Sequence, residues 1–516
     1  MTNQDSVQKD KVFIRPPIVV VMGHIDHGKT KILDWYRQTK VVEQESGGIT
    51  QHIGAYEVEH HGKKITFIDT PGHEAFSKMR SRGANVADIA VLVVAADEGI
   101  KPQTKEAIDI IQKNNLTFVV AINKTDKPEA NIDRVRQQLA EENILVESYG
   151  GKVPSVQISA KTGENMDELL EVLLLLAELE NLTAQPQKPA EGVVIEAHLD
   201  PKRGITSTLL IRDGGLALGS ILVIGNSVEN VKIFEDFLAR PIERAGPSSP
   251  VRIIGLAQTP LVGDTFRAFG SRIESEEFAK TVIREDKKPR PKLVKTGEEG
   301  GKPIFNLIIK ADVLGSKEVL EESLKKIESA TIGLNILKSE VGNINETDIK
   351  LAMATKLVTI IGFKVKVDSS AREIADRNNI RIVTGDVIYK VLDEVKEKMQ
   401  EMIPPSINRI DLGKIKILKV FSAKGGATSG GKKGGNKQVV GGRVEDGIVR
   451  KGARIDIKRF REVVGVGTIL ELQRGKQAAE EVAKGSELGI LADSKTPIEE
   501  GDVLEIYQEE IVKQKL

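Results

Sequence analysis

The chain has 516 residues, and its 75 lysines and arginines balance 75 aspartates and glutamates, so the overall charge favours neither presence nor absence of a nucleic-acid partner. This length exceeds what one hydrophobic core organises, which predicts several domains. The chain has no cysteine, which excludes disulfides, thiolate metal sites and a cysteine nucleophile. No secretion or import pattern begins the chain, and the apolar stretch 172–182 falls short of the ~20 residues that span a bilayer. We therefore expect a cytoplasmic protein without membrane association.

The first part of the chain alternates strand-like and helical patterns. Residues 1–16 are expected to be a disordered tail, and residues 17–183 to form one domain. Apolar runs predict strands at 17–22, 64–69, 89–96, 117–123 and 155–159, and amphipathic patterns predict helices that include 29–39 and 102–113. This rhythm indicates a mostly parallel sheet wrapped by helices.

Short runs of alternating apolar and polar residues follow, separated by turns rich in Gly, Asp and Pro. They predict a small antiparallel β-barrel over residues 184–283, and the Pro-containing segment 182–192 links it to the first domain. Residues 284–302 are charged and rich in Pro and Gly, which predicts a linker. Four strands alternate with helices over residues 303–386, which predicts an α/β domain.

A long amphipathic pattern covers residues 387–403, and Pro404 and Pro405 end it. We expect a connecting helix over 387–405, and the sequence leaves open whether it is a free rod or packs against its own domain. Residues 406–516 again read as short strands and turns, a second β-barrel. The Gly- and Lys-rich stretch 424–437 within it predicts a mobile loop.

The most informative short motif is GHIDHGKT at residues 23–30, which directly follows the first strand. It fits the phosphate-loop pattern, in which Gly23 and Gly28 let the backbone turn, Lys29 meets the β- and γ-phosphates, and Thr30 binds Mg²⁺. A helix follows, and its N-terminus favours phosphate. The predicted phosphate site comprises Gly23, His24, Ile25, Asp26, His27, Gly28, Lys29, Thr30 and Lys31.

Three further motifs follow strands, at the sheet edge where ligands bind in such folds. In DTPGH (69–73), Asp69 can hold Mg²⁺ through water, and Gly72 can present its N–H to a γ-phosphate. In NKTD (123–126), Asp126 can accept from two adjacent N–H groups, which guanine offers and adenine does not. Asn123 can pin the loop and bond the purine edge, and the Lys124 stem can lie on the base. SAK at 159–161 adds Ser159, Ala160 and Lys161, with the Ala160 N–H facing a purine carbonyl.

Taken together, these motifs resemble the translational GTPases and, within them, the family of bacterial translation initiation factor two. The resemblance covers almost the whole chain. Its specific stretches are GGITQHIGAY (47–56), DTPGHEAFSKMRSRGANVADIAVLVVAADEG (69–99), KPQTKEAI (101–108), KADVLGS (310–316) and IEEGD (498–502). It implies a P-loop GTPase domain followed by an antiparallel β-barrel, an α/β domain, a connecting helix and a second β-barrel.

The resemblance also implies roles for single residues. Thr50 would bind Mg²⁺ only when a γ-phosphate is present, and His73 would orient the attacking water, although a capping or packing histidine is the alternative. Lys31 departs from the Ser or Thr usual in the family. Its backbone N–H would still serve the α-phosphate, and we expect its side chain to face solvent rather than the phosphates.

Local charge singles out the last barrel. From Gly413 to Arg461 there are fourteen lysines and arginines against three acids, which favours a polyanion over a merely solvated basic face. The family uses this barrel to hold initiator tRNA by its formylmethionyl end. Family members often carry cysteines where this chain has GGR and ELG, near Gly442 and Leu488. Phe421, Phe460 and Tyr507 are expected in the core rather than in a pocket.

The resemblance implies a GTP-dependent initiation factor with GTP/GDP and Mg²⁺ as cofactors. It would promote binding of initiator fMet-tRNA to the small ribosomal subunit and joining of the large subunit, and would hydrolyse GTP on the ribosome, acting as a monomer. An elongation-type, tRNA-delivering GTPase is one alternative. The other is a ribosome-binding scaffold whose nucleotide site is only structural.

Overall fold

A computed structural model describes residues 13–37, 53–282, 304–327, 332–355, 357–402, 406–421, 436–460, 462–475 and 477–512. Thr50, the linker 284–302 and most of the stretch 424–437 therefore lie outside the described residues, while Asn436 and Lys437 begin strand β23. The chain divides into two compact units, Met1–Met399 and Gln400–Leu516.

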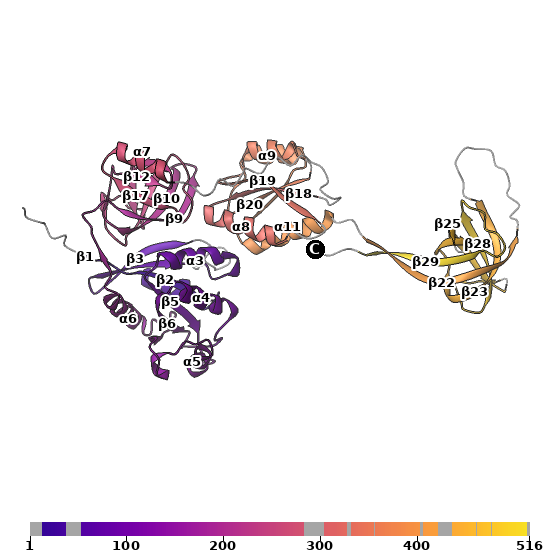
Figure 1. Cartoon of the computed structure of the whole chain (residues 1–516), viewed down its shortest axis with the longest axis horizontal. Helices are drawn as coiled ribbons and strands as arrows, with labels where there is room; N and C mark the ends of the chain where they lie inside the picture. Colours follow the sequence, from indigo (N-terminus) through magenta and orange to yellow (C-terminus); the bar gives the residue numbers. More distant parts are fainter. Residues whose placement is uncertain are drawn as a thin grey trace, which may run out of the picture. The chain divides into compact units, whose positions relative to one another are not determined.

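The first domain of unit 1 is built on a six-stranded sheet of order β3-β4-β2-β5-β6-β7 (Figure 1). All neighbours are parallel except β3 and β4. Its strands are β2 (Ile18–Gly23), β3 (Gly54–His60), β4 (Lys63–Asp69), β5 (Ile89–Ala95), β6 (Thr117–Asn123) and β7 (Ser155–Gln157). The predicted strands are all present, and the edge strand β3 is an addition.

Helices cover both faces of this sheet because its central strands are buried throughout. α1 (Lys29–Arg37) and α6 (Met166–Leu179) share a core with one face, through residues such as Leu33 and Leu170. The other helical elements are η2 (Glu74–Phe76), α3 (Ser77–Val86), α4 (Pro102–Lys113), α5 (Ile132–Glu141) and η3 (Glu147–Tyr149).

The start of the described chain differs from the expected tail. β1 (Phe13–Ile14) pairs antiparallel with β8 (Thr183–Ala184), and the Arg15 guanidinium forms a 2.6 Å ion pair with Asp88. Residues 13–16 are thus attached to the first domain, because a buried charge pair and strand hydrogen bonds outweigh the entropy of a short segment.

The second domain is a seven-stranded antiparallel sheet of order β13-β12-β17-β9-β10-β16-β14 around its own apolar core. Its main strands are β9 (Glu191–Asp200), β10 (Gly204–Asp213), β12 (Ile221–Ile224), β13 (Ser227–Asn230), β14 (Ile233–Asp236), β16 (Pro250–Leu256) and β17 (Thr265–Phe269). β11 (Leu216–Ala217) pairs with β15 (Arg244–Ala245), and α7 (Arg272–Thr281) follows.

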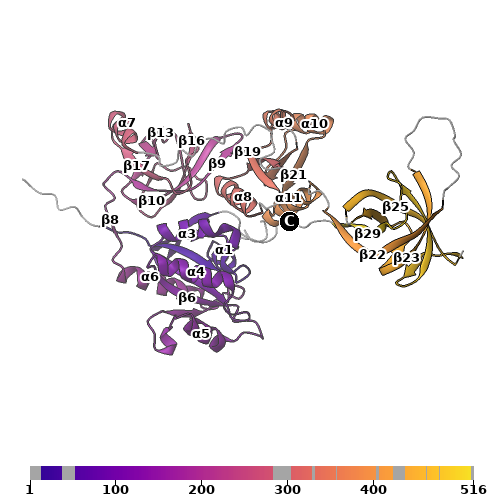
Figure 2. The ribbon, with the colours of Figure 1, turned by 45° about the vertical axis from the view of Figure 1, so that its right-hand side comes forward.

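The third domain has a parallel sheet of order β19-β18-β20-β21. Its strands are β18 (Ile304–Ala311), β19 (Gly333–Val341), β20 (Val358–Phe363) and β21 (Arg381–Gly385). Its helices are α8 (Leu314–Ile327), α9 (Glu346–Met353), α10 (Ser369–Arg377) and α11 (Ile388–Met402). α9 and α10 lie on one face of the sheet and α8 and α11 on the other (Figure 2).

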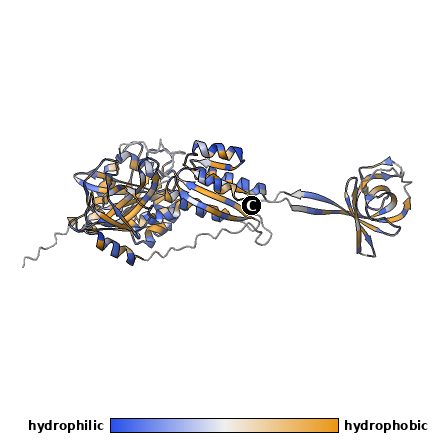
Figure 3. Cartoon of the chain, turned by 90° about the horizontal axis from the view of Figure 1, so that it is seen from above, coloured by the Kyte–Doolittle hydropathy of each residue, from blue (hydrophilic) through white to orange (hydrophobic). Residues whose placement is uncertain are grey.

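α11 answers the question that the sequence left open. Ile388, Val391, Val395 and Met399 repeat at helical spacing and are all almost completely buried. α11 therefore packs its apolar stripe against its own domain instead of standing as a free rod. In Figure 3 hydrophobic residues colour much of the sheets of unit 1, and its helices mix hydrophilic and hydrophobic residues.

Unit 2 is a closed six-stranded antiparallel barrel, because β22 pairs with both β29 and β23 at the ends of the order β22-β29-β24-β25-β28-β23. Its strands are β22 (Ser406–Phe421), β23 (Asn436–Arg450), β24 (Arg454–Arg459), β25 (Glu462–Arg474), β28 (Glu487–Ser494) and β29 (Val503–Val512), with short β26 (Gln477–Ala478) and β27 (Glu481–Ala483). The expected fold class, from GTPase-type domain to second barrel, is thus confirmed.

Candidate nucleotide site and nucleic-acid face

The phosphate loop lies between β2 and α1, and two glycines make its path possible. Gly23 has φ +145°, and a Cβ there would fall 2.4 Å from the Val93 carbonyl oxygen. Gly28 has φ +90°, and a Cβ there would fall 2.3 Å from the Asn123 amide nitrogen. Both positions therefore require glycine for conformation and for space.

Lys29 is the buried cation of this loop. Its side chain is nearly enclosed, and Nζ donates to the carbonyl oxygens of Gly23 at 3.0 Å and His24 at 2.7 Å. Burial lowers the pKa of Lys29 to about 8, and the Asp69 carboxylate opposes that shift. A Cβ on Gly72 would lie 2.3 Å from Nζ, so the DTPGH loop comes directly against the lysine. An anionic ligand here would stabilise the charged ammonium.

The oxygen donors expected for Mg²⁺ lie on the same edge of the sheet. Thr30 is the second residue of α1, and Asp69 is the last residue of β4 and is 2% exposed. A hydroxyl and a carboxylate are ligand types that Mg²⁺ prefers, so the described residues fit the ion. Thr50, the third residue assigned to the metal, is outside the described residues.

Asn123 joins two of the predicted loops. Its Nδ2 donates to the His27 carbonyl oxygen at 2.9 Å, and its Oδ1 accepts from the Ala160 N–H at 3.1 Å. The side chain is 2% exposed, so both bonds are shielded from water. The phosphate loop and the SAK loop are thereby held in one frame. The Ala160 N–H, which we expected to face a purine oxygen, is directed to Asn123.

Asp126 is held for binding by its neighbour. Its Oδ1 accepts from the Ser159 hydroxyl at 2.7 Å, and Lys161 Nζ lies 3.9 Å from Oδ2. The Ser159 hydrogen bond is the main cause that lowers the pKa of Asp126, which favours the carboxylate form. Lys124, with φ +65°, pairs with Glu98 at 3.2 Å. The expected guanine-binding residues therefore lie together at the ends of β6 and β7.

The remaining loop residues differ in exposure. Asp26 is exposed with φ +61°, and the Ile25 N–H donates to the Gln103 side chain at 3.2 Å. Lys31 is exposed, as expected for a side chain that faces solvent. His27 is fully buried, and burial lowers its pKa to about 4. His24 stands edge to face against His27, with ring centroids 5.0 Å apart.

His73 begins the short helix η2, and its Nδ1 accepts from the Ala75 N–H at 3.4 Å. Its ring lies against Tyr389 of α11, with centroids 3.9 Å apart. Burial is the largest cause that lowers the pKa of His73, so the imidazole is neutral near pH 7. The structure thus shows the capping and packing that we gave as the alternative for His73, and its orientation of an attacking water stays a prediction.

Arg80 is a buried residue next to the DTPGH loop that the sequence analysis did not identify. It is 1% exposed, and its guanidinium donates to the carbonyl oxygens of Pro71, at 2.9 Å, and His73. A bidentate pair with Glu106, at 2.6 and 2.7 Å, compensates its charge. Arg80 therefore fixes the backbone that carries Gly72 and His73. An arginine one turn into a helix after DTPGH is the only sequence signal it gives.

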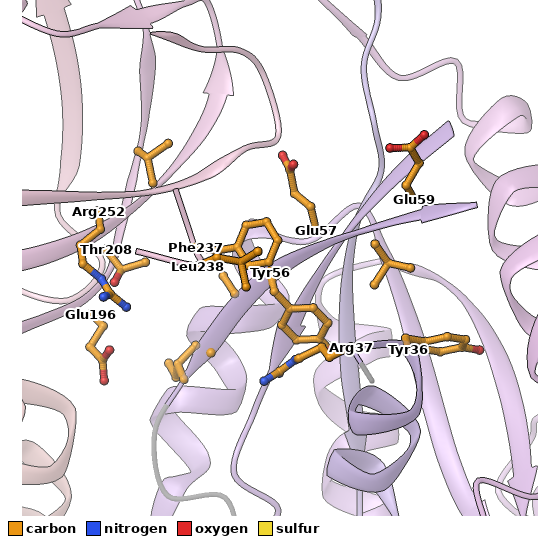
Figure 4. A pocket seen from close by; sticks show the side chains of 15 residues that line it. Tyr36, Arg37, Tyr56, Glu57, Glu59, Glu196, Thr208, Phe237, Leu238 and Arg252 are labelled. Carbon is orange, nitrogen blue, oxygen red and sulfur yellow. The ribbon is translucent and has the colours of Figure 1, made fainter. Parts of the chain in front are cut away.

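A separate cavity of about 500 Å³ lies between the first and second domains. Figure 4 shows Tyr36, Arg37 and Tyr56 on its first-domain side and Glu196 and Arg252 on its barrel side. The Arg37 guanidinium lies 3.5 Å above the Tyr56 ring. None of the predicted nucleotide-site residues that the structure describes lines this cavity, so it is distinct from the phosphate loop.

The basic stretch of the second barrel is largely paired with acids from distant strands. Lys414 and Lys458 both reach Glu505, at 2.9 and 2.8 Å, and Arg459 binds Asp502 at 2.9 Å. Further pairs join Arg409 to Asp456, Arg450 to Glu481, Lys451 to Glu480 and Arg454 to Glu509. Counting charges along 413–461 therefore overstates the free positive charge, because antiparallel pairing brings in acids from 480–509.

A positive face remains on β22 and β23. Lys416 and Arg443 are direct cross-strand partners, and both side chains are exposed. Lys419, which pairs with Gly441 in the same ladder, is also exposed. Like charges placed opposite each other destabilise a strand pair, so an anionic ligand would reduce the repulsion between Lys416 and Arg443. Lys416, Lys419 and Arg443 thus form an exposed positive face in the described part of the barrel.

The three aromatic residues that we expected in the core of this barrel differ in their exposure. Tyr507 is 8% exposed, as expected for the core, with the Arg409 guanidinium 3.9 Å above its ring. The expectation is wrong for the other two: Phe421 is 49% exposed and Phe460 is 96% exposed. Phe460 occupies the turn between β24 and β25 with φ +51°, which takes it out of the inward alternation of a strand.

Within the described part of the chain, no helix has the length and apolarity required to cross a lipid bilayer.

Comparison with family models matches three segments. Residues 15–178 match the Elongation factor Tu GTP binding domain, residues 189–269 match Elongation factor G domain 2, and residues 280–396 match Translation-initiation factor 2.

Curated relatives extend the similarity over nearly the whole chain. A protein of Desulforamulus reducens named "Translation initiation factor IF-2" is 41% identical over 522 residues, covering 98% of this chain and 51% of the relative. Proteins of the same name from Rubrobacter xylanophilus and Bacillus pumilus are each 42% identical and are covered over 71% and 72% of their length. The chain thus spans about half of the first of these relatives and more of the others.

Among solved structures, that of GDP-bound aIF5B from Aeropyrum pernix aligns over 96% of this chain and 92% of its own, at 28% identity and a TM-score of 0.47.

Proposed function

The chain belongs to the translation initiation factor IF-2 family, and from that premise we propose that it is a GTP-dependent initiation factor. It would promote binding of initiator fMet-tRNA to the small ribosomal subunit and joining of the large subunit, and would hydrolyse GTP on the ribosome. The initiation role rests on the family, and the observation that carries the nucleotide part of the proposal is the double hydrogen bond of Asn123, which ties the phosphate loop to the SAK loop. A nucleoside triphosphate has to engage both loops at once.

The roles of the site residues follow from this frame. Lys29 would offer its buried ammonium to the β- and γ-phosphates, and backbone N–H groups of the loop other than that of Ile25, which donates to Gln103, would face the phosphate chain. Asp126, kept ionised by Ser159, accepts from two guanine N–H groups. Adenine offers no such pair, so the site selects GTP and GDP. The Lys124 stem and the 159–161 loop complete the base pocket.

Mg²⁺ would be held by the Thr30 hydroxyl and, through water, by Asp69, with Thr50 added when the γ-phosphate is present. The ion supplies charge neutralisation between the β- and γ-phosphates. Residues 47–56 and 69–80 would be ordered by GTP and relax after its cleavage, which is the switch by which the factor leaves the ribosome.

Hydrolysis needs positioning more than a strong base. A neutral His73 can accept a hydrogen bond from the attacking water and hold it in line with the γ-phosphate. The Arg80–Glu106 pair supports this role, because it fixes the carbonyl groups on either side of Gly72. Ribosome contact would move His73 from its tilted ring contact with Tyr389 towards the water.

The direct test is GTP turnover by His73→Ala with and without 70S ribosomes. We expect nucleotide affinity within about twofold of the parent and a loss of ribosome-stimulated hydrolysis of ~10²-fold or more. Glu74→Ala, one residue away on the same short helix, serves as the control. Normal turnover by His73→Ala would remove that residue from the reaction.

For the tRNA we propose the β22–β23 face of the second barrel. Replacing Lys416 and Arg443 with glutamate should weaken filter binding of initiator fMet-tRNA by about tenfold or more and flatten its salt dependence. Lys484→Glu is the matched control, since Lys484 is exposed but already paired with Asp446 at 2.9 Å. Equal losses in both variants would mean that only general charge matters.

The same measurements address the two alternatives. An elongation-type GTPase would bind elongator aminoacyl-tRNA as well as initiator tRNA. A scaffold with a structural nucleotide would show no GTP hydrolysis with purified ribosomes. The third domain and the second barrel favour the initiation role over the first alternative, and the complete set of nucleotide motifs favours it over the second.

A further inference from the structure

Two histidines and a glutamate gather where the β3–β4 hairpin meets α6, outside the four nucleotide motifs. Ligand atoms of His60, His61 and Glu171 all lie within 4.8 Å of one another. The two imidazole rings have centroids 4.1 Å apart and are tilted by 58°. We propose that this cluster binds one divalent transition-metal ion of the zinc class, and that the ion ties the hairpin to the helix.

The turn explains how two consecutive histidines come together. Successive side chains of a strand point to opposite faces of the sheet, so His60 and His61 would diverge in a regular strand. Here His60 pairs with Lys63 across the hairpin, and the two central residues have positive φ, +49° at His61 and +74° at Gly62. That is a two-residue turn of the primed type, and it brings the second ring back beside the first.

α6 presents its acids to the same place. Asp167 and Glu171 are four residues apart and so share one face of the helix. Asp167 Oδ1 lies 4.0 Å from His60 Nδ1. Two turns further along, Glu178 pairs with Lys63 Nζ at 2.6 Å. The lysine of the hairpin is thus engaged with Glu178, which leaves Asp167 and Glu171 facing the histidines.

The chemical types of the ligand atoms indicate which metal ions the cluster would bind. Two imidazoles with carboxylates suit Zn²⁺, Ni²⁺ or Cu²⁺, whereas Mg²⁺ takes oxygen ligands only. His60 is the anchor, because its side chain is only 11% exposed, and its Nε2 is buried without a hydrogen bond to any described residue. His61 and Glu171 are exposed, so their side chains are free to move inwards to metal–ligand bonds of about 2.0–2.2 Å. Asp167 is in place to orient His60 or to complete the shell.

The test is a zinc titration by calorimetry on the full chain, saturated with GDP and Mg²⁺ so that the nucleotide site is occupied. Two variants remove ligands with little strain: Glu171→Gln keeps the shape, and His61→Asn suits the left-handed turn. His198→Asn, in β9 of the second domain, is the matched histidine control. Circular dichroism and GDP affinity verify that each variant is folded.

We expect one Zn²⁺ per chain in the parent and in His198→Asn, and at least a tenfold loss of affinity in His61→Asn and Glu171→Gln. Cobalt substitution should give the visible bands of a tetrahedral site with nitrogen ligands, and zinc should slow hydrogen exchange of residues 58–63. Absence of stoichiometric zinc uptake by the parent, or uptake that both variants retain, would overturn the proposal.

Discussion

His27 is a fully buried titratable group in the middle of the phosphate loop. Its Nδ1 accepts from the Ala95 N–H at 3.3 Å, and its carbonyl oxygen receives the Asn123 amide. Protonation of His27 would place a second positive charge in an enclosed space beside Lys29, whose own charged form is already disfavoured by burial. The loop is therefore built for a neutral imidazole, and acid should loosen it.

The predicted consequence is a pH-dependent stability of the first domain. The pKa of His27 falls from 6.5 to about 4 on folding, so between these values the unfolded chain binds more protons and stability falls as pH is lowered. The loss should begin near pH 6.5, approach about 3 kcal/mol, and level off below pH 4. His27→Asn should flatten this profile relative to the parent.

Urea titrations at each pH, followed by fluorescence, measure this effect in the right domain, because Trp35 of α1 is the single tryptophan of the chain. Equal pH profiles for the parent and His27→Asn would contradict the assignment. His24 and His73 also have lowered pKa values. They affect the stability of the parent and of His27→Asn alike, so their effect is removed when the two pH profiles are subtracted.

For single residues, the sequence predicts which side chains lie near one another, but not their hydrogen-bond partners in the nucleotide-free protein. Asn123, Asp126 and Ala160 lie together because strand ends of a parallel sheet meet at one edge. Their mutual hydrogen bonds, and the contact of Gln103 with the Ile25 N–H, depend on side-chain geometry that spacing does not encode. Arg80 escapes detection because a buried arginine looks like a solvated helix residue until its partner Glu106 is known.

Among the elements, α11 is the one whose packing matters most for the site. It buries its apolar stripe in the third domain and presents Tyr389 to the His73 ring of the first. The Tyr389 hydroxyl is buried and makes no hydrogen bond to any described residue. The ring contact with Tyr389 thus adds to the hydrogen bond from the Ala75 N–H in holding the His73 imidazole in this position, and the Tyr389 hydroxyl contributes nothing to it.

Two substitutions separate these effects. Tyr389→Phe keeps the ring and removes a buried hydroxyl, so we expect unchanged or slightly higher stability and unchanged GTP turnover. Tyr389→Ala frees His73, and we expect a several-fold rise in ribosome-independent hydrolysis, measured as phosphate release under single-turnover conditions. Tyr149→Ala, on the exposed η3 element, is the control. A fall in hydrolysis with Tyr389→Ala would show that the contact supports catalysis.

Sequence patterns predict elements well where the pattern is strong. Continuous apolar runs mark the buried parallel strands, and helical spacing marks α11. β3 was missed because this edge strand carries polar residues such as Glu57 and Glu59 on its outer side. The paired charges of the second barrel were missed for a different reason: Glu505 and Asp502 come from β29 and the turn before it, far along the chain from Lys414 and Arg459.

At the scale of unit 1, the third domain contacts the first through α8 and α3. Arg82 pairs with Glu318 at 2.6 Å and Lys78 with Glu322 at 3.0 Å, and a Cβ on Gly315 would fall 2.4 Å from the end of Met79. Only the short η2 separates α3 from the DTPGH loop, so we expect a shift of that loop to reach α8 through these side-chain contacts. Polar contacts of this kind suit an interface that opens and closes.

Charge reversal tests this coupling. Arg82→Glu or Glu318→Arg places like charges together and should weaken the α3–α8 contact, whereas the double reversal should restore it. Because both side chains are about a quarter exposed, we expect a coupling energy of only about 0.5–1 kcal/mol, decreasing with salt. Hydrogen exchange of 314–327 and 77–86 at low and high salt measures it. Faster exchange in the single variants, with recovery in the double variant, is the expected pattern. Additive effects would mean that the Arg82–Glu318 pair does not connect the two domains, and that the packing of Met79 on Gly315 and the Lys78–Glu322 pair carry the contact.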